Sequence, residues 1–227
     1  LVNVPLGTPL NTSRAFLVGN RGALAITNSA VNASGGFDIV SGSVIGLLAG
    51  YFNVVDAVVM RVMDGIMAIP SILLAIALVA LLGSSVTVVI VAISIPEIPR
   101  VTRLVRAVVL SVRDLPFVEA ARSNGTRVGK LMRRHILPST VAPLIVQATY
   151  ICASAILTEA GLSFLGAGTP PEIPTWGNMI AGNRLYLQIA PWTIFAPGIC
   201  LALVVLAVNL LGDGLRDRLD PRISRGI

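Results

Sequence analysis

Long runs without a charged residue constrain the fold of this chain more than any other feature. Four such runs occur, at residues 39–55, 65–96, 139–158 and 185–212. A helix rises about 1.5 Å per residue, so about 20 apolar residues cross the hydrocarbon of a bilayer. Only 12% of the residues are charged, whereas a soluble domain carries about 25%. The sequence therefore predicts an all-α fold, a polytopic bundle of transmembrane helices.

Glycine and proline divide these runs into spans. Gly83, Ser84 and Ser85 are expected to break the longest run into two helices joined by a tight turn. Residues 53–64, which carry Asp56, Arg61 and Asp64, are interpreted as a cytoplasmic connection. Five spans are predicted in all, within residues 23–52, 65–82, 86–98, 139–158 and 189–211.

The N-terminal part of the sequence shows the weakest secondary-structure pattern. Residues 1–38 contain several Pro, Gly and Asn and show no clean apolar period, so they are interpreted as a poorly defined segment. The chain begins at Leu1 without a signal-peptide pattern, and we expect a first span to be missing from it. Residues 39–227 are predicted to form the transmembrane domain.

The basic residues are clustered. Of the 17 Lys and Arg, nine lie between Arg100 and Arg134 and four between Arg216 and Arg225. Clusters beside membrane spans follow the positive-inside rule, so both clusters and the C-terminus are expected in the cytoplasm. No binding of nucleic acid is expected. Arg100, Arg103 and Arg106 recur every three residues and predict a basic stripe for lipid headgroups or cytoplasm.

No catalytic constellation is found in the sequence. The single histidine, His135, has no nucleophile beside it, and Cys152 and Cys200 fall inside predicted spans as packing residues. Residues 125–130 imitate a phosphate-binding loop but have the wrong spacing, and Leu131 stands where Ser or Thr would bind magnesium. We therefore expect no enzyme, no bound cofactor and no metal in this chain.

The segment at residues 119–138, EAARSNGTRVGKLMRRHILP, is polar and lies between apolar runs. It predicts two short helices, with Glu119 near the start of the first and a turn at Gly125. Ala120 and Ala121 would let a partner approach the backbone closely, and Pro138 would end the second helix and begin the next span. The alternative is an ordinary basic loop that serves topology alone, which explains the charge but not the spacing.

This segment resembles the cytoplasmic loop of ATP-binding-cassette (ABC) importer permeases. The ending HILP at 135–138, together with LSFLG at 162–166, WGNM at 176–179 and LLGDGLR at 210–216, is similar to the dipeptide, oligopeptide and nickel branch, and most resembles its second permease subunit. The start departs from that branch, because Leu6-Gly7-Thr8 is not followed by the usual acidic and Gly-Arg-Asp positions.

The resemblance implies a type I importer permease fold in a bacterial or archaeal inner membrane, with a cytoplasmic coupling loop at residues 100–138. It implies half of a translocation pathway for peptides, paired with a second permease, two cytoplasmic ATPases that bind the ATP, and an extracytoplasmic solute-binding protein. Nickel or another small solute is the alternative cargo. An ion-coupled secondary carrier is the alternative class, for which acidic residues in mid-span and inverted repeats are expected. The residues implied in ATPase coupling are Glu119, Ala120, Ala121, Arg122, Ser123, Asn124, Gly125, Leu137 and Pro138.

Glu159 has a functional and a structural interpretation, and several other polar and aromatic residues have a structural interpretation alone. Glu159 is either a pathway or gate residue, or an interface residue bonded to the Gly-rich outer loop predicted at 159–184. Glu97 is expected to pair with Arg100. Asp213 and Arg216 are expected to cap and solvate the last helix. The predicted interface anchors are Trp176, Tyr186 and Trp192.

Overall fold

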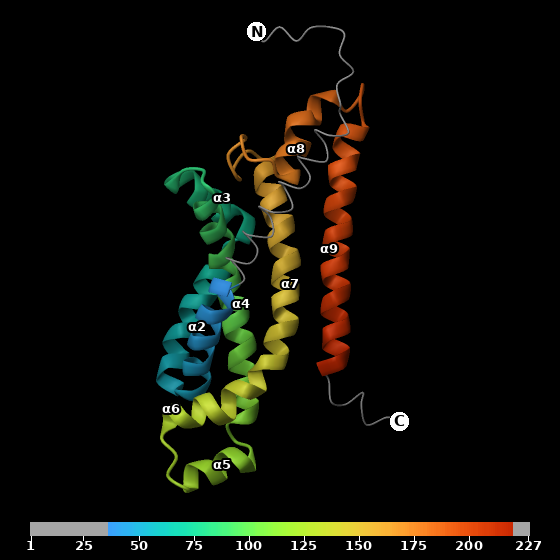
Figure 1. Ribbon diagram of the computed structural model, residues 1–227. Helices are drawn as coiled ribbons and strands as arrows, with labels where there is room; N and C mark the ends of the chain where they lie inside the picture. Colours follow the sequence, from blue (N-terminus) through green and yellow to red (C-terminus); the bar gives the residue numbers. More distant parts are fainter. Residues whose placement is uncertain (1–35, 220–227) are drawn as a thin grey trace.

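The computed structural model describes residues 36–219, and within them every regular element is a helix. A first helix, Gly36–Tyr51, precedes the labelled elements. The longest helices, α4, α7 and α9, stand side by side, with α5 and α6 at one end of the bundle and α8 at the other (Figure 1). The labelled elements are α2 (Asn53–Met67), α3 (Ser71–Leu82), α4 (Val86–Val112), α5 (Pro116–Ser123), α6 (Val128–Leu131), the π-helix η1 (Met132–Ile136), α7 (Leu137–Phe164), α8 (Trp176–Asn183), the 3-10 turn η2 (Arg184–Tyr186) and α9 (Trp192–Leu219).

Two helices of the described residues are long and apolar enough to cross a membrane, Val128–Phe164 and Trp192–Leu219. The bent pair formed by α2 and α3 could make a third crossing. The spans predicted at 139–158 and 189–211 are thereby confirmed, but the count of five is not. The first helix is shorter, and α4 carries Glu97, Arg100 and Arg103 around its middle. The poorly defined segment predicted at residues 1–38 lies almost entirely outside the described residues, and the expected absence of a first span stays a prediction.

The predicted boundary between a connection at 53–64 and a span at 65–82 is wrong. Residues Asn53–Met67 form one helix, α2, and the chain then turns by 84° into α3. Pro70 causes the break, because proline disfavours helical geometry in the residue before it and donates no backbone hydrogen bond. The turn predicted at Gly83 is confirmed, with a φ of 86° that glycine adopts without strain.

The basic stripe of α4 forms ion pairs within the fold, two of them with α2, which corrects the prediction that it is kept for lipid headgroups. Arg103 donates to Asp64 at 2.5 Å, and Arg106 makes a two-pronged contact with Asp56, one arm of it at 2.6 Å. Arg100 pairs with Glu97 at 2.7 Å, as predicted. The partners of Arg103 and Arg106 lie 39 and 50 positions earlier in the chain and that of Arg100 three positions earlier, so this row of arginines is neutralised within the fold.

The first helix packs closely on α4 through glycines spaced one turn apart. A Cβ atom at each glycine would lie within 2.8 Å of a valine Cβ. Gly42 faces Val101, Gly46 faces Val105 and Gly50 faces Val109. Small residues at this spacing let two helix backbones approach, which is how helices associate where no hydrophobic driving force operates between them.

Two apolar clusters make up the core. One joins α3, α4, α7 and α8, and the other joins α4, α5, α6, η1 and α7. Cys152 and Cys200 pack against the first cluster. Trp176 is buried in it, with 3% of its surface exposed, so its assignment as an interface anchor was wrong. Tyr186 and Trp192 are exposed, as that prediction requires.

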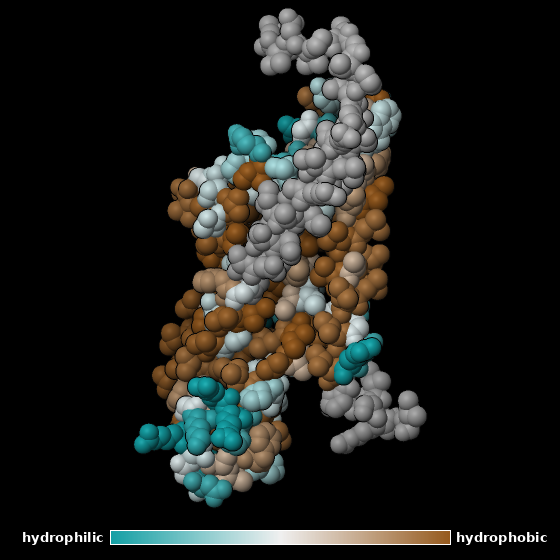
Figure 2. Space-filling view, in the orientation of Figure 1, coloured by the Kyte–Doolittle hydropathy of each residue, from teal (hydrophilic) through white to brown (hydrophobic). Residues whose placement is uncertain are grey.

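The outer surface is sorted by polarity. Brown, apolar residues cover the middle of the bundle, and hydrophilic residues gather at its two ends, most densely around α5 and α6 (Figure 2). An apolar belt between polar ends is the surface expected of a protein that sits in a bilayer.

Candidate functional site

The polar segment forms an elbow, residues 113–136, that protrudes at one end of the bundle (Figure 1). It is shorter than the predicted loop at 100–138, because α4 continues as a helix to Val112. Pro116 occupies the first turn of α5, where its missing N–H costs nothing. The helix–turn–helix expected from the sequence is present as α5, a turn and α6.

The turn at Gly125 has a defined hydrogen-bond geometry. Gly125 has a φ of 73°, its N–H donates to the Arg122 carbonyl at 3.0 Å, and the Thr126 N–H donates to the Ala121 carbonyl at 3.2 Å. These two bonds are the Schellman arrangement that ends a helix, and it favours glycine at the left-handed position. The predicted turn at Gly125 is confirmed.

Apolar anchors hold the elbow to the bundle. Val118 of α5 is 2% exposed, and it shares a buried cluster with Leu131 of α6, Ile136 of η1 and Val112 of α4. Ala121 packs against the same cluster. Because α6, η1 and α7 follow one another without a gap, the elbow is joined to a membrane span through continuous helix.

The face of α5 directed away from the bundle carries most of the predicted coupling residues. Its exposed members are Glu119, Ala120, Ser123, Asn124 and Gly125, while Arg122 is exposed but turns into the cleft described below. Ala121 is not among them, since it faces its own core. Ala120 is thus open to a partner's surface, as the sequence prediction requires, whereas Ala121 is partly covered by its own fold.

Leu137 and Pro138 lie apart from α5. Pro138 is exposed and lines a groove with Arg216 and Leu219 of α9. The prediction that Pro138 ends the second short helix is wrong, because the π-helical stretch of η1 continues directly into α7. The wider turns of a π-helix let the chain pass a proline without breaking. The structure thus separates this pair from the exposed residues of α5.

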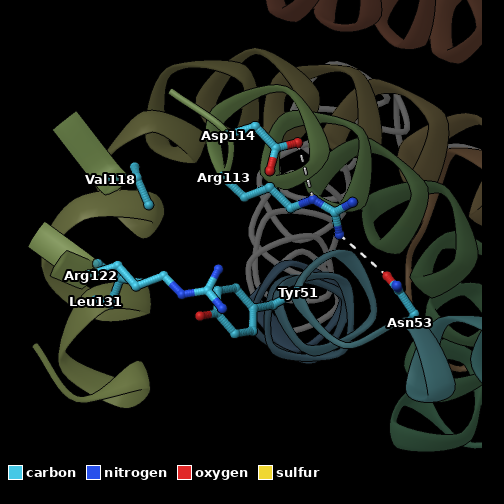
Figure 3. A pocket seen from close by; sticks show the side chains of 7 residues that line it. All are labelled: Tyr51, Asn53, Arg113, Asp114, Val118, Arg122 and Leu131. Carbon is cyan, nitrogen blue, oxygen red and sulfur yellow. Dashed lines mark hydrogen bonds and ion pairs between the residues drawn. The ribbon is translucent and has the colours of Figure 1, made fainter. Parts of the chain in front are cut away.

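A cleft of about 280 Å³ lies between α5 and the ends of the first helix and α4 (Figure 3). Arg113 fixes one wall, donating to the Gly50 carbonyl at 3.1 Å and to Asn53 at 3.4 Å. The Arg122 side chain extends across the cleft toward Tyr51. Arg122 therefore belongs to the inner side of α5, whereas Glu119 and Ala120 belong to its outer side.

Two apolar residues beside the motif were missed by the sequence analysis. Phe117 is 48% exposed, and Leu115 is also exposed, on either side of Pro116. Exposed apolar side chains on a polar elbow are typical of a surface that a partner covers. The signal was available in the sequence, since the apolar run LPFV at 115–118 stands between Asp114 and Glu119.

Glu159 lies at the opposite end of α7 from the elbow. It is 5% exposed, and its Oε1 accepts hydrogen bonds from Ser163 at 2.7 Å and from Thr169 at 3.2 Å. Asn178 of α8 donates to the Thr169 carbonyl at 3.2 Å. We call these four residues the Glu159 network. Of the two interpretations of Glu159, bonding to the outer loop is confirmed, and α7 continues past it to Phe164.

Residues 42–225 match the model of a family described as the binding-protein-dependent transport system inner membrane component. The chain belongs to this family. It is 64% identical over 177 residues to the probable peptide ABC transporter permease protein y4tQ of Sinorhizobium fredii, covering 78% of the chain and 61% of that relative. It is 46% identical over 187 residues to the dipeptide transport system permease protein DppC of Alkalihalophilus pseudofirmus, covering 82% and 62%. The chain thus spans about three fifths of the length of these relatives.

Among solved structures, an inward-facing form of the MetNI methionine ABC transporter superposes with a TM-score of 0.66 at 18% identity, covering 91% of this chain and 98% of that chain. This likeness concerns the fold. Together with the family match it confirms the type I importer permease fold and a multi-pass inner membrane protein.

Proposed function

We propose that this chain is a permease subunit of an ABC importer and forms half of a translocation pathway for peptides. Its family is a component of binding-protein-dependent transport, and the relatives described above are named for peptide and dipeptide transport. The observation that carries the proposal is the elbow, whose exposed outer face presents Glu119, Ala120 and Phe117 at one end of the bundle.

In this proposal α5 is a coupling helix that enters a groove on a partner ATPase. Val118, Ala121 and Leu131 fasten it to the bundle, so a displacement of α5 moves α4 and α7 with it. ATP is bound and hydrolysed by two partner subunits, and this chain supplies the moving helices. The resulting motion is a rigid-body change between inward-open and outward-open states.

A second permease completes the pathway, and an extracytoplasmic solute-binding protein delivers the cargo. Helix α9 offers a surface to this partner in the membrane, since most of its apolar length is exposed, with Leu203, Leu206 and Leu210 among the exposed side chains. The C-terminus is assigned to the cytoplasm, because Arg216 near the end of α9 shares a groove with Pro138 at the elbow end of α7.

The test is retention of the ATPase. The chain is expressed with the ATPase subunits of its own gene cluster, and Glu119→Lys is compared with the matched charge reversal Glu172→Lys in the exposed loop before α8. Glu119→Lys is expected to lower the ATPase that co-purifies by at least tenfold, with normal membrane insertion, while Glu172→Lys retains it. Equal retention by both variants would refute the role of α5.

Peptide cargo is tested by uptake into vesicles that contain the complete transporter. Dipeptide uptake driven by ATP and insensitive to ionophores supports the proposal. Uptake of nickel with no peptide uptake would assign the alternative cargo, and uptake that ionophores abolish in the presence of ATP would indicate an ion-coupled carrier.

A further inference from the structure

A second row of basic residues lies on α6 and η1, and it differs from the row on α4. Lys130, Arg133 and Arg134 are all exposed, and within residues 36–219 none of them has an acidic partner. We call these three the open basic row. Residues three and four apart share one face of a helix, so three positive charges stand together with nothing in the described fold to neutralise them.

The open basic row lines a cleft of about 570 Å³ together with Gly129. Gly129 adds no side chain, and the space where its Cβ would stand is empty. The cleft is therefore bounded by the three long cationic side chains, and no side chain fills it at Gly129. A guanidinium group offers paired N–H donors that match two oxygens of one phosphate, so the cleft suits a phosphate-bearing anion.

The position of this cleft narrows the choice of anion. Asn53 at the start of α2 and Leu131 at the end of α6 border the cleft beside Tyr51, so the N-terminal end of α2 lies at the level of α6. Directly after Asn53, α2 exposes Val54, Val58 and Val62, one residue per turn, with Val54 81% exposed. Figure 2 shows the hydrophilic surface around α6 directly beneath the apolar belt. Cationic and apolar surfaces are thus adjacent, in the order in which a phospholipid presents its headgroup and its chains.

We propose that this cleft binds the phosphate headgroup of an anionic phospholipid whose acyl chains lie along the exposed valines of α2. The contiguity of the basic cleft with the apolar surface favours a lipid over an acidic protein partner, which would need no apolar stripe. A lipid bound here neutralises the open basic row and holds the elbow at the bilayer surface. Each basic residue near an anionic headgroup strengthens binding by roughly fivefold, so the row contributes about a hundredfold.

The experiment is native mass spectrometry of the full chain in detergent, titrated separately with phosphatidylglycerol, phosphatidylcholine and inorganic phosphate. The wild-type chain is expected to show a saturable phosphatidylglycerol adduct and a much weaker phosphatidylcholine adduct. The triple variant Lys130→Gln, Arg133→Gln, Arg134→Gln is expected to bind phosphatidylglycerol about a hundredfold more weakly, and Arg133→Gln alone roughly fivefold more weakly. The matched control neutralises three other exposed arginines, Arg184, Arg216 and Arg218.

The outcomes separate the sources of the anion. Loss of the phosphatidylglycerol adduct in the triple variant alone, with unchanged helical circular dichroism, supports the proposal. Equal loss in both triple variants would mean a general effect of charge and would overturn the site. Inorganic phosphate that displaces the lipid adduct equally well would overturn the lipid as the occupant. A triple variant that retains the phosphatidylglycerol adduct would overturn the proposal, and loss of the co-purifying ATPase by the same variant in the retention assay above would assign the row to a protein partner.

Discussion

The two ends of α7 treat their polar groups in opposite ways. At one end the Glu159 network is buried and satisfied within the chain, through Ser163 at 2.7 Å and Thr169 at 3.2 Å. At the other end the elbow leaves Glu119 exposed, and nothing in the described residues pairs with the open basic row. The polar groups at the first end are satisfied by hydrogen bonds within the chain, whereas those at the second end are exposed and can bind other molecules.

This difference teaches which residues carry stability and which carry contacts. A buried carboxylate with internal donors contributes to the folded state, because removing it leaves those donors unpaired. An exposed residue on a firmly anchored helix contributes little to folding and is available for recognition. A buried residue of the Glu159 network whose removal leaves stability unchanged would contradict this comparison. An exposed residue of the elbow whose removal unfolds the protein would contradict it as well.

The largest effect is expected at the closed end. Glu159→Ala removes the acceptor shared by Ser163 and Thr169 and is expected to destabilise the protein by about 3 kcal/mol. Thermal unfolding in detergent micelles measures the loss. Glu172→Ala, on an exposed loop residue at the same end, is expected to change stability by less than about 0.5 kcal/mol. Equal unfolding midpoints for the two variants would contradict the structural role of the Glu159 network.

A smaller and more local effect is expected at the anchor of the elbow. Val118→Ala removes two buried methyl groups and is expected to cost about 2 kcal/mol. The loss falls on α5, so amide hydrogen exchange in α5 should quicken by roughly thirtyfold while α7 is unaffected. Phe117→Ala, one residue earlier and half exposed, is the control and should leave exchange unchanged. Faster exchange throughout the protein would show that the elbow is not a separate unit.

The turn of the elbow should respond to backbone strain. Gly125→Val places a branched side chain at a φ of 73° and is expected to cost about 1–2 kcal/mol, together with weaker binding of the ATPase. Gly182→Val in α8 is the matched control, because its Cβ also meets open space and its φ is ordinary. A Gly125 variant as stable as the Gly182 variant would mean that the turn tolerates another geometry.

Local features of this fold could be predicted from the sequence. The turns at Gly83 and Gly125 follow from glycine's access to positive φ, and both are present at 86° and 73°. The spans carried by α7 and α9 follow from the length of their apolar runs. The exposed residues of α5, for which we propose a coupling role, were picked out by the motif that begins at Glu119, because that motif lies within one short segment.

Features that depend on distant partners could not be predicted. The arginines of α4 looked like a headgroup stripe, because Asp56 and Asp64 are remote in sequence and the helical nature of α2 was not recognised. Which alanine of the motif faces outward depends on where α5 docks, and the sequence gives no period long enough to decide it. Trp176 looked like an interface anchor, but the packing of α8 against α7 buries it.

The central claim is that the outer face of α5 contacts an ATPase, and a photo-reactive amino acid at Ala120 tests it most directly. In membranes that contain the complete transporter, irradiation is expected to join the chain to its ATPase subunit, and the same probe at Gly182 should give no such product. Ala120 that crosslinks only to lipid or to a permease subunit, with the ATPase present and active, would contradict the account.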